Sequence, residues 1–436
     1  MMAGDVFRLS FRMPRERRKT PRLRSGSWAG LMILLLLGCG CSSEPATSVG
    51  GDSAGAHWVG TWSSAQQAPV PVVYQGPYRF RDETLRQVVR VSIGGTRLRV
   101  RFSNCLGAAP LVIDAASVGI QEQGAAIRPD SLRVLTFGGE PVVTVARGAR
   151  VLSDPVDLAV PEEADLAVSV YVSGDTMPST MHVRALQVSF ISPAGDFTGV
   201  GEMPVVGTTT SWFWLSGVEV CAHPDTPVVV ALGDSITDGY ASTIGANAAY
   251  PSVLARRLLA RTPGGSRIAV LNAGIGGNRV LADFIGPNVQ ARLDRDVLTQ
   301  SGITHVILLA GINDIGIPEL LGLPGANAEA LIAGYRQIIQ RVHARGLKII
   351  GGTLLPYEGA MYYSAAGEET REAVNAWIRT GNAFDGIVDF DELVGDPANP
   401  RRMLPIYDSG DHLHPGDAGY AAMAEAAERA LLPMIP

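Results

Sequence analysis

Residues 228–239 read VVVALGDSITDG, an apolar run that ends in a glycine and passes into polar residues. Mainly apolar runs recur later in the chain, at residues 268–273, 305–310, 348–355 and 386–390. Helix-like segments lie between and after these runs, at residues 250–261, 327–345, 368–379 and 416–432. Continuous apolar strands that alternate with amphipathic helices predict an α/β fold with a parallel sheet covered on both faces. Such sheets bind ligands at the carboxyl ends of their strands, so the loops there are expected to carry the chemistry.

Polar and glycine-rich motifs follow the first three runs and recur near the C-terminus. Ser235 lies in GDS, where a helix can begin, Gly277 lies in GIGGN and Asn313 lies in GIND. Each motif alone is also typical of an ordinary turn or helix cap. In DSGDHLHPG, Asp411 precedes His414 by three residues, so both side chains point the same way if they share a turn. Asp411 can then fix the tautomer of His414, as a general base that serves a serine requires.

Two other interpretations of these motifs are weaker. A second GDS stands in GDSAG (51–55), which even fits the G-x-S-x-G pattern of a nucleophile turn. Such a turn needs a buried strand before the serine and a helix after it, and the pattern around Ser53 predicts neither. Asp411, His412 and His414 could instead bind a metal, but no other His or Cys lies nearby at metal-ligand spacing. We therefore expect no metal site, and we interpret His412 as structural or solvated.

Taken in order, the four motifs resemble the four blocks of the SGNH hydrolases, also called GDSL esterases and lipases. Ser235, Gly277, Asn313 and His414 fall on the four motif positions, and the resemblance covers about residues 226–434. It implies a flavodoxin-like three-layer α/β/α domain that hydrolyses acyl esters with no metal and no cofactor.

On this basis the sequence predicts a serine esterase. Ser235 would attack the ester carbonyl, His414 would take the serine proton and pass it to the leaving alcohol, and Asp411 would orient His414. The backbone amides of Ser235 and Gly277 and the side-chain amide of Asn313 would form the oxyanion hole.

Residues 57–222 have the period-two pattern of strands. In TRLRVRF, arginines alternate with apolar residues, which predicts a strand with one apolar face. The apolar run before it, residues 88–93, joins it across Gly94-Gly95, a two-residue hairpin signal. Further strand-like runs occur at residues 141–145, 167–172 and 186–191. We predict a β-sandwich, jelly-roll-like domain ahead of the hydrolase domain at 223–436. With RQVVRVSIGG, RFSN and SWFWLSGVEV, it looks like the β-rich extension of a bacterial subgroup of the family.

Residues 1–38 are predicted to form a lipoprotein signal peptide. Eight basic residues precede the apolar run Trp28–Leu37, which is too short to span a bilayer as a mature helix. LLGC (36–39) resembles a bacterial lipobox, so Cys39 is the predicted lipidation site and membrane anchor. A plain signal peptide cut nearby is the alternative. Residues 39–56, which are small, polar and glycine-rich, are predicted to be a flexible tether.

The protein is therefore expected to be an exported cell-envelope lipoprotein, on the periplasmic or cell-surface side of a bacterial membrane. Residues 1–38 carry eight basic and two acidic side chains, so their removal leaves 28 basic and 40 acidic residues, a net charge of −12. Such a charge argues against nucleic acid or an anionic membrane surface as a partner. Export also places Cys105 and Cys221 where a disulfide can persist, and a disulfide and two buried thiols are both open alternatives.

The predicted crevice is rich in Gly, Asn and Asp, and no long apolar segment suggests a lid. We therefore expect a small-molecule or polysaccharide ester with a short acyl group on a polar alcohol, such as an acetylated polysaccharide. Lysophospholipase, thioesterase and aryl esterase are alternatives within the same enzyme class. A surface carbohydrate-binding lipoprotein with an inactive hydrolase half is the alternative from another class. Trp212 and Trp214 could stack on a sugar, although tryptophans at a domain junction more often fill the core.

Overall fold

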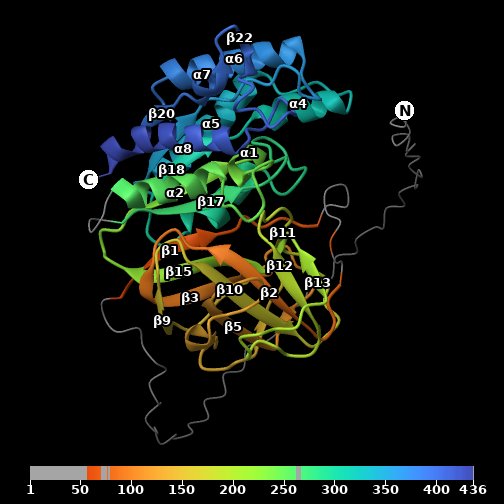
Figure 1. Ribbon diagram of the computed structural model, residues 1–436. Coiled ribbons are helices and arrows are strands. Elements are labelled where there is room, and N and C mark those ends of the chain that lie inside the picture. Colours follow the sequence, from red (N-terminus) through yellow and green to blue (C-terminus); the bar gives the residue numbers. More distant parts are fainter. Residues whose placement is uncertain (1–55, 70–75, 77–78, 262–266, 436) are drawn as a thin grey trace, which may run out of the picture. The chain divides into compact units, whose positions relative to one another are not determined.

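The computed structural model describes residues 56–69, 76, 79–261 and 267–435. The predicted signal peptide, the predicted lipidation site Cys39 and nearly all of the predicted tether lie outside the described residues. The described residues belong to one compact unit, in which a β-rich part precedes an α/β part (Figure 1). Within these ranges, no helix has the length and apolar character needed to cross a membrane.

The α/β part is built on a parallel sheet of five strands. These strands are β16 (Val228–Gly233), β17 (Ala269–Gly274), β18 (Ile303–Leu309), β19 (Lys348–Gly352) and β20 (Gly386–Val388). Their order across the sheet is β17-β16-β18-β19-β20, and each neighbouring pair is parallel. Each predicted apolar run forms one strand. Because β17 lies on one side of β16 and β18 on the other, the strand order reverses at β16, and a crevice is expected at its carboxyl end.

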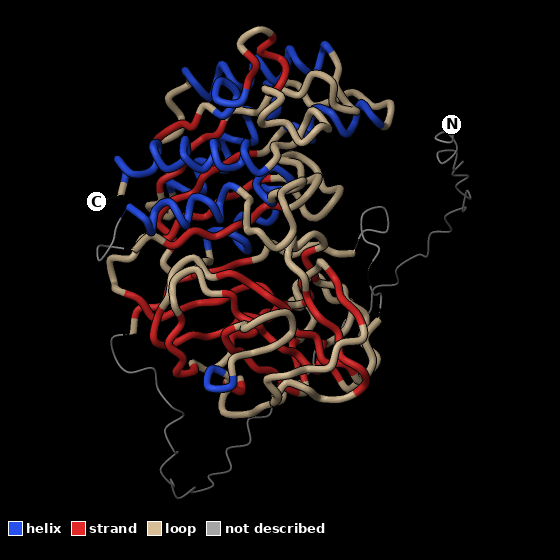
Figure 2. Tube along the Cα trace, viewed as in Figure 1, coloured by secondary structure: helices blue, strands red, loops and turns tan. Residues whose placement is uncertain are grey.

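Helices cover both faces of this sheet, with α2 and α8 packed together on one face (Figures 1 and 2). The helices are α1 (Ser235–Asp238), α2 (Tyr250–Arg261), α3 (Val289–Leu293), α4 (Ile312–Leu320), α5 (Ala328–His343), α6 (Ala365–Thr380), α7 (Phe390–Val394) and α8 (Asp417–Leu431), with a π-helical turn η2 (Asp294–Leu298) and a 3₁₀ turn η3 (Leu432–Met434). Apolar spacing explains how they dock. In α5, for example, Leu331, Tyr335, Ile338 and Val342 form one buried stripe, and the Asn327 side chain caps the helix start.

The β-rich part is a sandwich of two antiparallel sheets. One sheet contains β1 (His57–Ser63), β15 (Leu215–Ala222), β3 (Gly95–Ser103), β8 (Arg150–Leu152) and β9 (Val156–Val160). The other contains β13 (Gly207–Thr209), β12 (Ser189–Ala194), β2 (Glu83–Arg90), β10 (Asp165–Val172), β5 (Ala115–Ile120) and β6 (Arg133–Val134). The alternation predicted in β3 is confirmed, because Leu98, Val100 and Phe102 are fully buried.

Short elements complete the described chain. Two-stranded ladders join β4 (Leu111–Ile113) to β7 (Val143–Val145), β11 (Met181–His182) to β14 (Trp212–Phe213) and β21 (Gly395–Asp396) to β22 (Asn399–Met403), and η1 (Pro129–Ser131) is a 3₁₀ turn. Trp212 and Trp214 fill the core of the β-rich part, in agreement with the structural interpretation: Trp214 is 1% exposed, and the indole of Trp212 donates to Val88 O at 2.9 Å.

The predicted hairpin across Gly94-Gly95 is wrong. β2 and β3 lie in different sheets, because β2 pairs with β10 and β12 whereas β3 pairs with β15. Neither glycine has the positive φ that a two-residue hairpin turn requires. A Cβ on Gly94 would instead lie 2.2 Å from the carbonyl oxygen of Val160, so this position needs glycine for close packing where the chain crosses between the sheets.

A disulfide between Cys105 and Cys221 is not formed, and both are free thiols. Cys221 follows Val220, which pairs with Leu98 early in β3, whereas Cys105 lies just beyond the far end of β3. The two cysteines therefore stand at opposite ends of one strand pair, beyond the reach of a disulfide.

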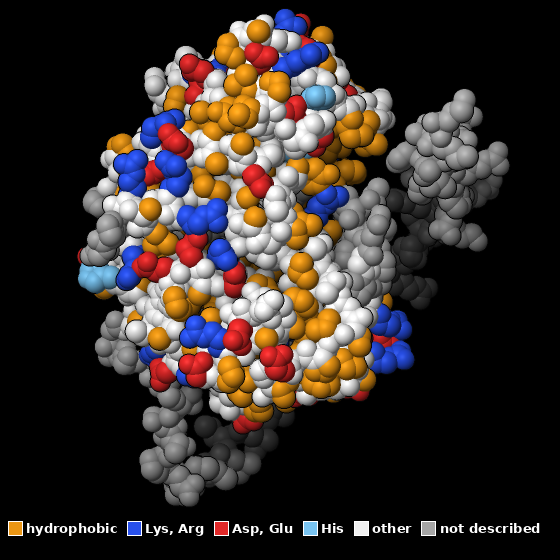
Figure 3. Space-filling view, viewed as in Figure 1, with side chains coloured by type: hydrophobic (Ala, Val, Ile, Leu, Met, Phe, Trp, Pro, Cys, Tyr) orange, Lys and Arg blue, Asp and Glu red, His pale blue; other side chains and the backbone are white. Residues whose placement is uncertain are grey.

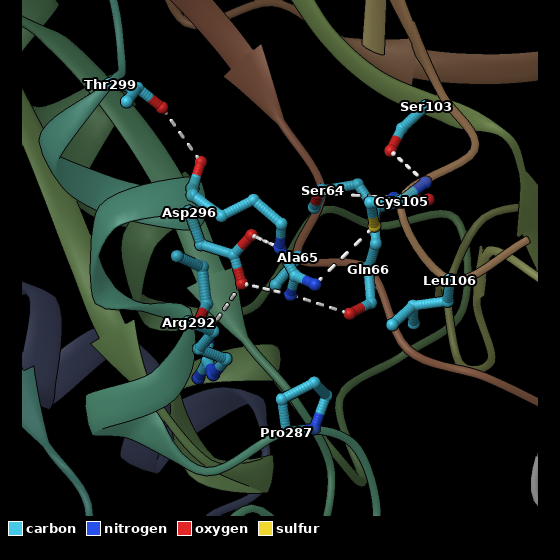
Figure 4. Close-up of polar contacts among 12 residues, drawn as sticks. Ser64, Ala65, Gln66, Ser103, Cys105, Leu106, Pro287, Arg292, Asp296 and Thr299 are labelled. Carbon is cyan, nitrogen blue, oxygen red and sulfur yellow. Dashed lines mark hydrogen bonds and ion pairs between the residues drawn. The ribbon is translucent and has the colours of Figure 1, made fainter. Parts of the chain in front are cut away.

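Hydrogen bonds join the β-rich part to the α/β part. Gly60 N in β1 donates to Ser301 O at 2.9 Å, and Ser63 Oγ donates to Asn272 O in β17 at 3.1 Å. In η2, Arg295 Nη2 donates both to Gln66 O, at 2.8 Å, and to the carboxylate of Asp296 (Figure 4). These bonds fix the start of the chain's described part against the strands and turns that carry the candidate site.

Candidate active site

Ser235 is held at the carboxyl end of β16 by a tight turn. Gly233 ends the strand, and a Cβ there would lie 2.1 Å from Thr237 Oγ1 and 2.3 Å from Leu309 O, so only glycine fits. Asp234 caps the one-turn helix α1, its Oδ1 accepting from Ile236 N at 3.0 Å. Ser235 is the first residue of α1 and is 6% exposed, so its hydroxyl is largely shielded from water.

The structure brings Ser235, His414 and Asp411 together in one hydrogen-bonded chain. Ser235 Oγ lies 2.8 Å from His414 Nε2, and His414 Nδ1 lies 2.6 Å from Asp411 Oδ2. The other carboxylate oxygen of Asp411 accepts from His414 N at 2.8 Å and from Leu413 N at 3.0 Å. Because the carboxylate only accepts, the imidazole carries its proton on Nδ1 and donates it to Asp411, which leaves Nε2 to accept from the serine hydroxyl.

The surroundings of His414 favour this arrangement. Partial burial of Asp411 opposes its charge, but hydrogen bonds from the imidazole and the backbone of His414 outweigh burial and hold the pKa of Asp411 well below its usual range. Asp411 is therefore a carboxylate at every pH at which the protein is expected to work. The ring of Tyr240 packs against the imidazole, with ring centroids 4.3 Å apart, and limits its rotation.

Gly277 and Asn313 lie on the loops that follow β17 and β18, the two strands that flank β16. Gly277 has φ +71°, and a Cβ there would lie 2.6 Å from Ile285 Cδ1, so glycine is required. Asn313 lies in the first turn of α4 and is 3% exposed. Its Nδ2 donates to Asn278 O at 3.1 Å, and its Oδ1 accepts from Tyr362 Oη at 3.2 Å. An amide group has two N–H bonds, so one can bind Asn278 while the other donates to an oxyanion.

The other carboxylates near Ser235 have different partners. Asp314 accepts from Val280 N at 2.7 Å and from Leu281 N at 2.9 Å, and burial raises its pKa to about 6. Asp238 contacts His182 and the amide of Gly276. Within the described part of the chain, Asp411 is the carboxylate that forms an ion pair with His414.

Arg279 and His412 take structural positions. Arg279 Nη2 donates to Asp283 O at 2.9 Å, and its guanidinium lies over the ring of Phe284. His412 Nδ1 lies 2.6 Å from Asp408 Oδ2, and this histidine has φ +62°, in the left-handed region. Among the described residues, no three His, Cys, Asp or Glu side chains are grouped closely enough to hold a metal ion.

Sequence reasoning missed Arg292, which joins the two loops beneath the site. Its guanidinium is buried and donates to Gly233 O at 2.8 Å, to Ala273 O at 2.7 Å and to Asn278 Oδ1 at 2.9 Å. It therefore ties the carboxyl end of β16 to the end of β17 and to the residue after Gly277. In the sequence, Arg292 lies in a stretch with several charges that reads as a solvated helix face, so no local signal marks it.

Comparison with known protein families finds a match to the α/β part of the chain. The model of the GDSL-like lipase/acylhydrolase family matches residues 231–422, a range that contains Ser235, Gly277, Asn313, Asp411 and His414. Comparison with curated proteins finds no match.

Solved structures of similar fold cover about half of this chain. A protein of the G-D-S-L family from Desulfitobacterium hafniense, described as lipolytic, is 25% identical over 46% of this chain and 98% of its own, with a TM-score of 0.37. A lipase/acylhydrolase from Enterococcus faecalis is 18% identical over 48% of this chain and 98% of its own, with a TM-score of 0.39. An aryl esterase from M. smegmatis, in inhibitor-bound form, is 14% identical over 48% of this chain and 100% of its own, with a TM-score of 0.39. Residues 231–422 thus form a domain that matches the GDSL-like lipase/acylhydrolase family, and the protein is a carboxylic ester hydrolase.

Proposed function

We propose that Ser235 is the nucleophile of this esterase, His414 its general base and Asp411 the residue that orients His414. The observation that carries the proposal is the chain of hydrogen bonds from Ser235 Oγ through the imidazole to the Asp411 carboxylate, at 2.8 and 2.6 Å. A base that accepts from a serine hydroxyl and is oriented on its other side is the arrangement that nucleophilic catalysis requires.

The reaction then runs in two halves. As Ser235 Oγ bonds to the ester carbonyl carbon, His414 Nε2 takes the hydroxyl proton, and it returns that proton to the alcohol as the ester bond breaks. Water adds to the acyl-enzyme by the same route, which releases the acid and restores the serine. In both halves the carbonyl oxygen becomes an oxyanion, which the amides of Ser235 and Gly277 and the side chain of Asn313 would hold.

The roles are tested by hydrolysis of p-nitrophenyl acetate. Ser235→Ala and His414→Ala should each lower kcat by about a millionfold, because the groups act as a unit, and Asp411→Ala should cost less. Ser53→Ala, in the other GDS motif, is the matched control and should keep full activity. Near-normal activity of Ser235→Ala would refute the assignment.

We propose short-chain acyl esters of carbohydrates, above all acetyl esters, as substrates. The support is the polar character of the loops at the site, in which Asp234 caps the turn that carries Ser235 and the amide of Asn313 lies in the first turn of α4.

Exposed apolar side chains support longer acyl or aryl esters as a second candidate. Six of them stand on segments that follow the carboxyl ends of the strands: Ile244, Phe284, Leu320, Leu321, Leu323 and Met361. They could contact the tail of a lysophospholipid or thioester, or an aromatic alcohol. A series of p-nitrophenyl esters from acetate to laurate, run beside acetylated xylan, separates the candidates. Preference for acetate with release of acetate from xylan supports the carbohydrate ester, and preference for laurate would refute it.

Export and lipid anchoring through Cys39 remain part of the proposal, on sequence alone. Growth in labelled palmitate should label the protein, and Cys39→Ala should abolish the label. Nucleic acid is not proposed as a partner, and on the face shown in Figure 3 the Lys and Arg side chains lie among Asp and Glu rather than in one basic patch.

A further inference from the structure

The β-rich part contacts the segment that follows the nucleophile through residues 181–187. Gly245 N donates to Leu186 O at 2.9 Å, and Gln187 Nε2 donates to Asn247 Oδ1 at 2.7 Å. The guanidinium of Arg184 lies 4.6 Å from the ring centroid of Tyr240, the ring that packs against His414. A part of the fold remote in sequence therefore reaches the immediate surroundings of the site.

His182 makes the most buried of these contacts. Its side chain is 3% exposed, Nδ1 lies 2.9 Å from Ala65 O, and Nε2 lies 2.9 Å from Asp238 Oδ1. A carbonyl oxygen only accepts, so Nδ1 carries a proton, and the facing carboxylate requires a second proton on Nε2. Burial disfavours the imidazolium, but the charge and hydrogen bond of Asp238 outweigh burial and raise the pKa of His182. The pair is a buried imidazolium facing a carboxylate.

Asp238 connects this pair to two catalytic loops. It is the last residue of α1, the helix that Ser235 begins. Its Oδ2 accepts from Gly276 N at 3.2 Å, directly before Gly277. The same carboxylate therefore touches the loop of the second oxyanion donor while its backbone belongs to the helix of the first.

We propose that His182 is a positioning residue of the esterase: through Asp238 it holds α1 and the Gly277 loop at the separation that the oxyanion hole requires. The inference rests on the proposed roles of Ser235 and Gly277. It assigns a catalytic purpose to the β-rich part, which supplies the cation that hydrogen-bonds to Asp238 Oδ1.

Loss of His182 would leave this carboxylate without the cation that hydrogen-bonds to it. Asp238 would then turn toward water or take up a proton, and either change weakens its hold on the Gly276 amide. Because an ångström of misplacement at a reacting centre can cost about a hundredfold in rate, we expect a loss in kcat with little change in substrate binding.

The test compares His182→Gln, Asp238→Asn and the double variant on p-nitrophenyl acetate. His182→Gln should lower kcat about 10- to 100-fold and leave KM within about threefold, because the oxyanion contacts act on the transition state. The double variant should lose no more than His182→Gln alone, since it carries no unpaired buried charge. His343→Gln is the matched control: His343 pairs with Asp385 at 2.8 Å, at the opposite edge of the sheet, and its loss should not change kcat.

Thermal midpoints are measured for each variant. If His182→Gln does not fold, Asp238→Asn carries the test, and its kcat should fall at unchanged KM. Wild-type kcat in either folded variant, or losses that add in the double variant, would overturn the inference. That failure differs from failure of the proposed function, because Ser235→Ala would then still be inactive.

Discussion

Asn313 is placed by two neighbours, since its amide donates to Asn278 O and accepts from the hydroxyl of Tyr362. If the remaining N–H of this amide binds the oxyanion, Asn313→Ala should lower kcat about 100- to 1,000-fold, or about 3 kcal/mol, with KM little changed. Steady-state kinetics on p-nitrophenyl acetate measure the effect.

Tyr362→Phe is the graded control for that variant. It removes only the hydroxyl that orients Asn313, so its kcat should fall by about tenfold at most. A larger loss in Tyr362→Phe than in Asn313→Ala would show that the tyrosine hydroxyl, and not the amide, stabilises the transition state.

Asp234 gives a prediction for the pH dependence of stability. Burial, with the nearby charge of Asp314 adding to it, raises the pKa of Asp234 to about 7, against about 3.9 in an unfolded chain. Between these values the folded state binds more protons, so the free energy of unfolding falls as the pH rises. From pH 5 to pH 8 this carboxyl should cost about 3 kcal/mol, and Asp234→Asn should remove that part of the loss.

Urea unfolding at both pH values measures this effect. Asp225→Asn, at an exposed carboxyl, should leave the pH dependence of the wild type in place. An Asp234→Asn variant with the same pH dependence as the wild type would show that Asp234 is ionised at neutral pH.

The site residues that could be predicted are those whose chemistry is local. Asp411 and His414 are three residues apart, and Ser235 directly follows a strand that its own sequence defines. His182, by contrast, meets Asp238 across 56 residues of chain, and Tyr362 meets Asn313 across 49. No spacing rule connects such pairs, because their approach depends on how whole elements pack.

At the scale of elements, Arg292 joins α3 to the ends of β16 and β17. A lysine concentrates its donors on one atom and cannot reach three separated acceptors as the guanidinium does. Arg292→Lys should therefore lower the free energy of unfolding by about 3 kcal/mol, because buried acceptors lose their donors. Denaturant midpoints measure the change.

Arg279→Lys is the matched control for Arg292→Lys. Arg279 is also an arginine near the site, but it is partly exposed and donates to carbonyls of its own loop. It should change stability by less than about 1 kcal/mol. Equal losses in the two variants would show that Arg292 has no special part in joining the strands.

The elements of the parallel sheet could be predicted because long apolar runs define them, and residues 250–261 form α2 as expected. The helix α4 was missed, since Gly316 and Pro318 within it resemble a loop. The prediction of a hairpin at Gly94-Gly95 was wrong for the opposite reason. A two-residue signal was present, but burial of Val91 and Ile93 carries the chain into the other sheet.

At the scale of the molecule, the β-rich and α/β parts are expected to unfold together, because hydrogen bonds such as Ser63 Oγ to Asn272 O join them. Four of the six tryptophans, Trp58, Trp62, Trp212 and Trp214, lie in the β-rich part, so fluorescence reports mainly its unfolding. Loss of esterase activity reports the site in the α/β part. The two urea transitions should coincide, and separate midpoints would show that the parts are independent.

The sequence could indicate a β-sandwich beside an α/β domain, but not how the two parts meet. That junction is set by close contacts, such as the position of Gly60, where a Cβ would lie 2.9 Å from Leu271 Cδ1. Contacts of this kind leave no periodic pattern in either segment, so the role of the β-rich part could be inferred only from the folded chain.

The central claim is that Ser235 is the activated nucleophile, and covalent labelling tests it most directly. The protein is treated with a fluorophosphonate, digested and mapped by mass spectrometry. We predict one adduct, on the peptide that contains Ser235, with none on the Ser235→Ala variant. An adduct on another serine, or equal labelling of the Ser235→Ala variant, would contradict the account.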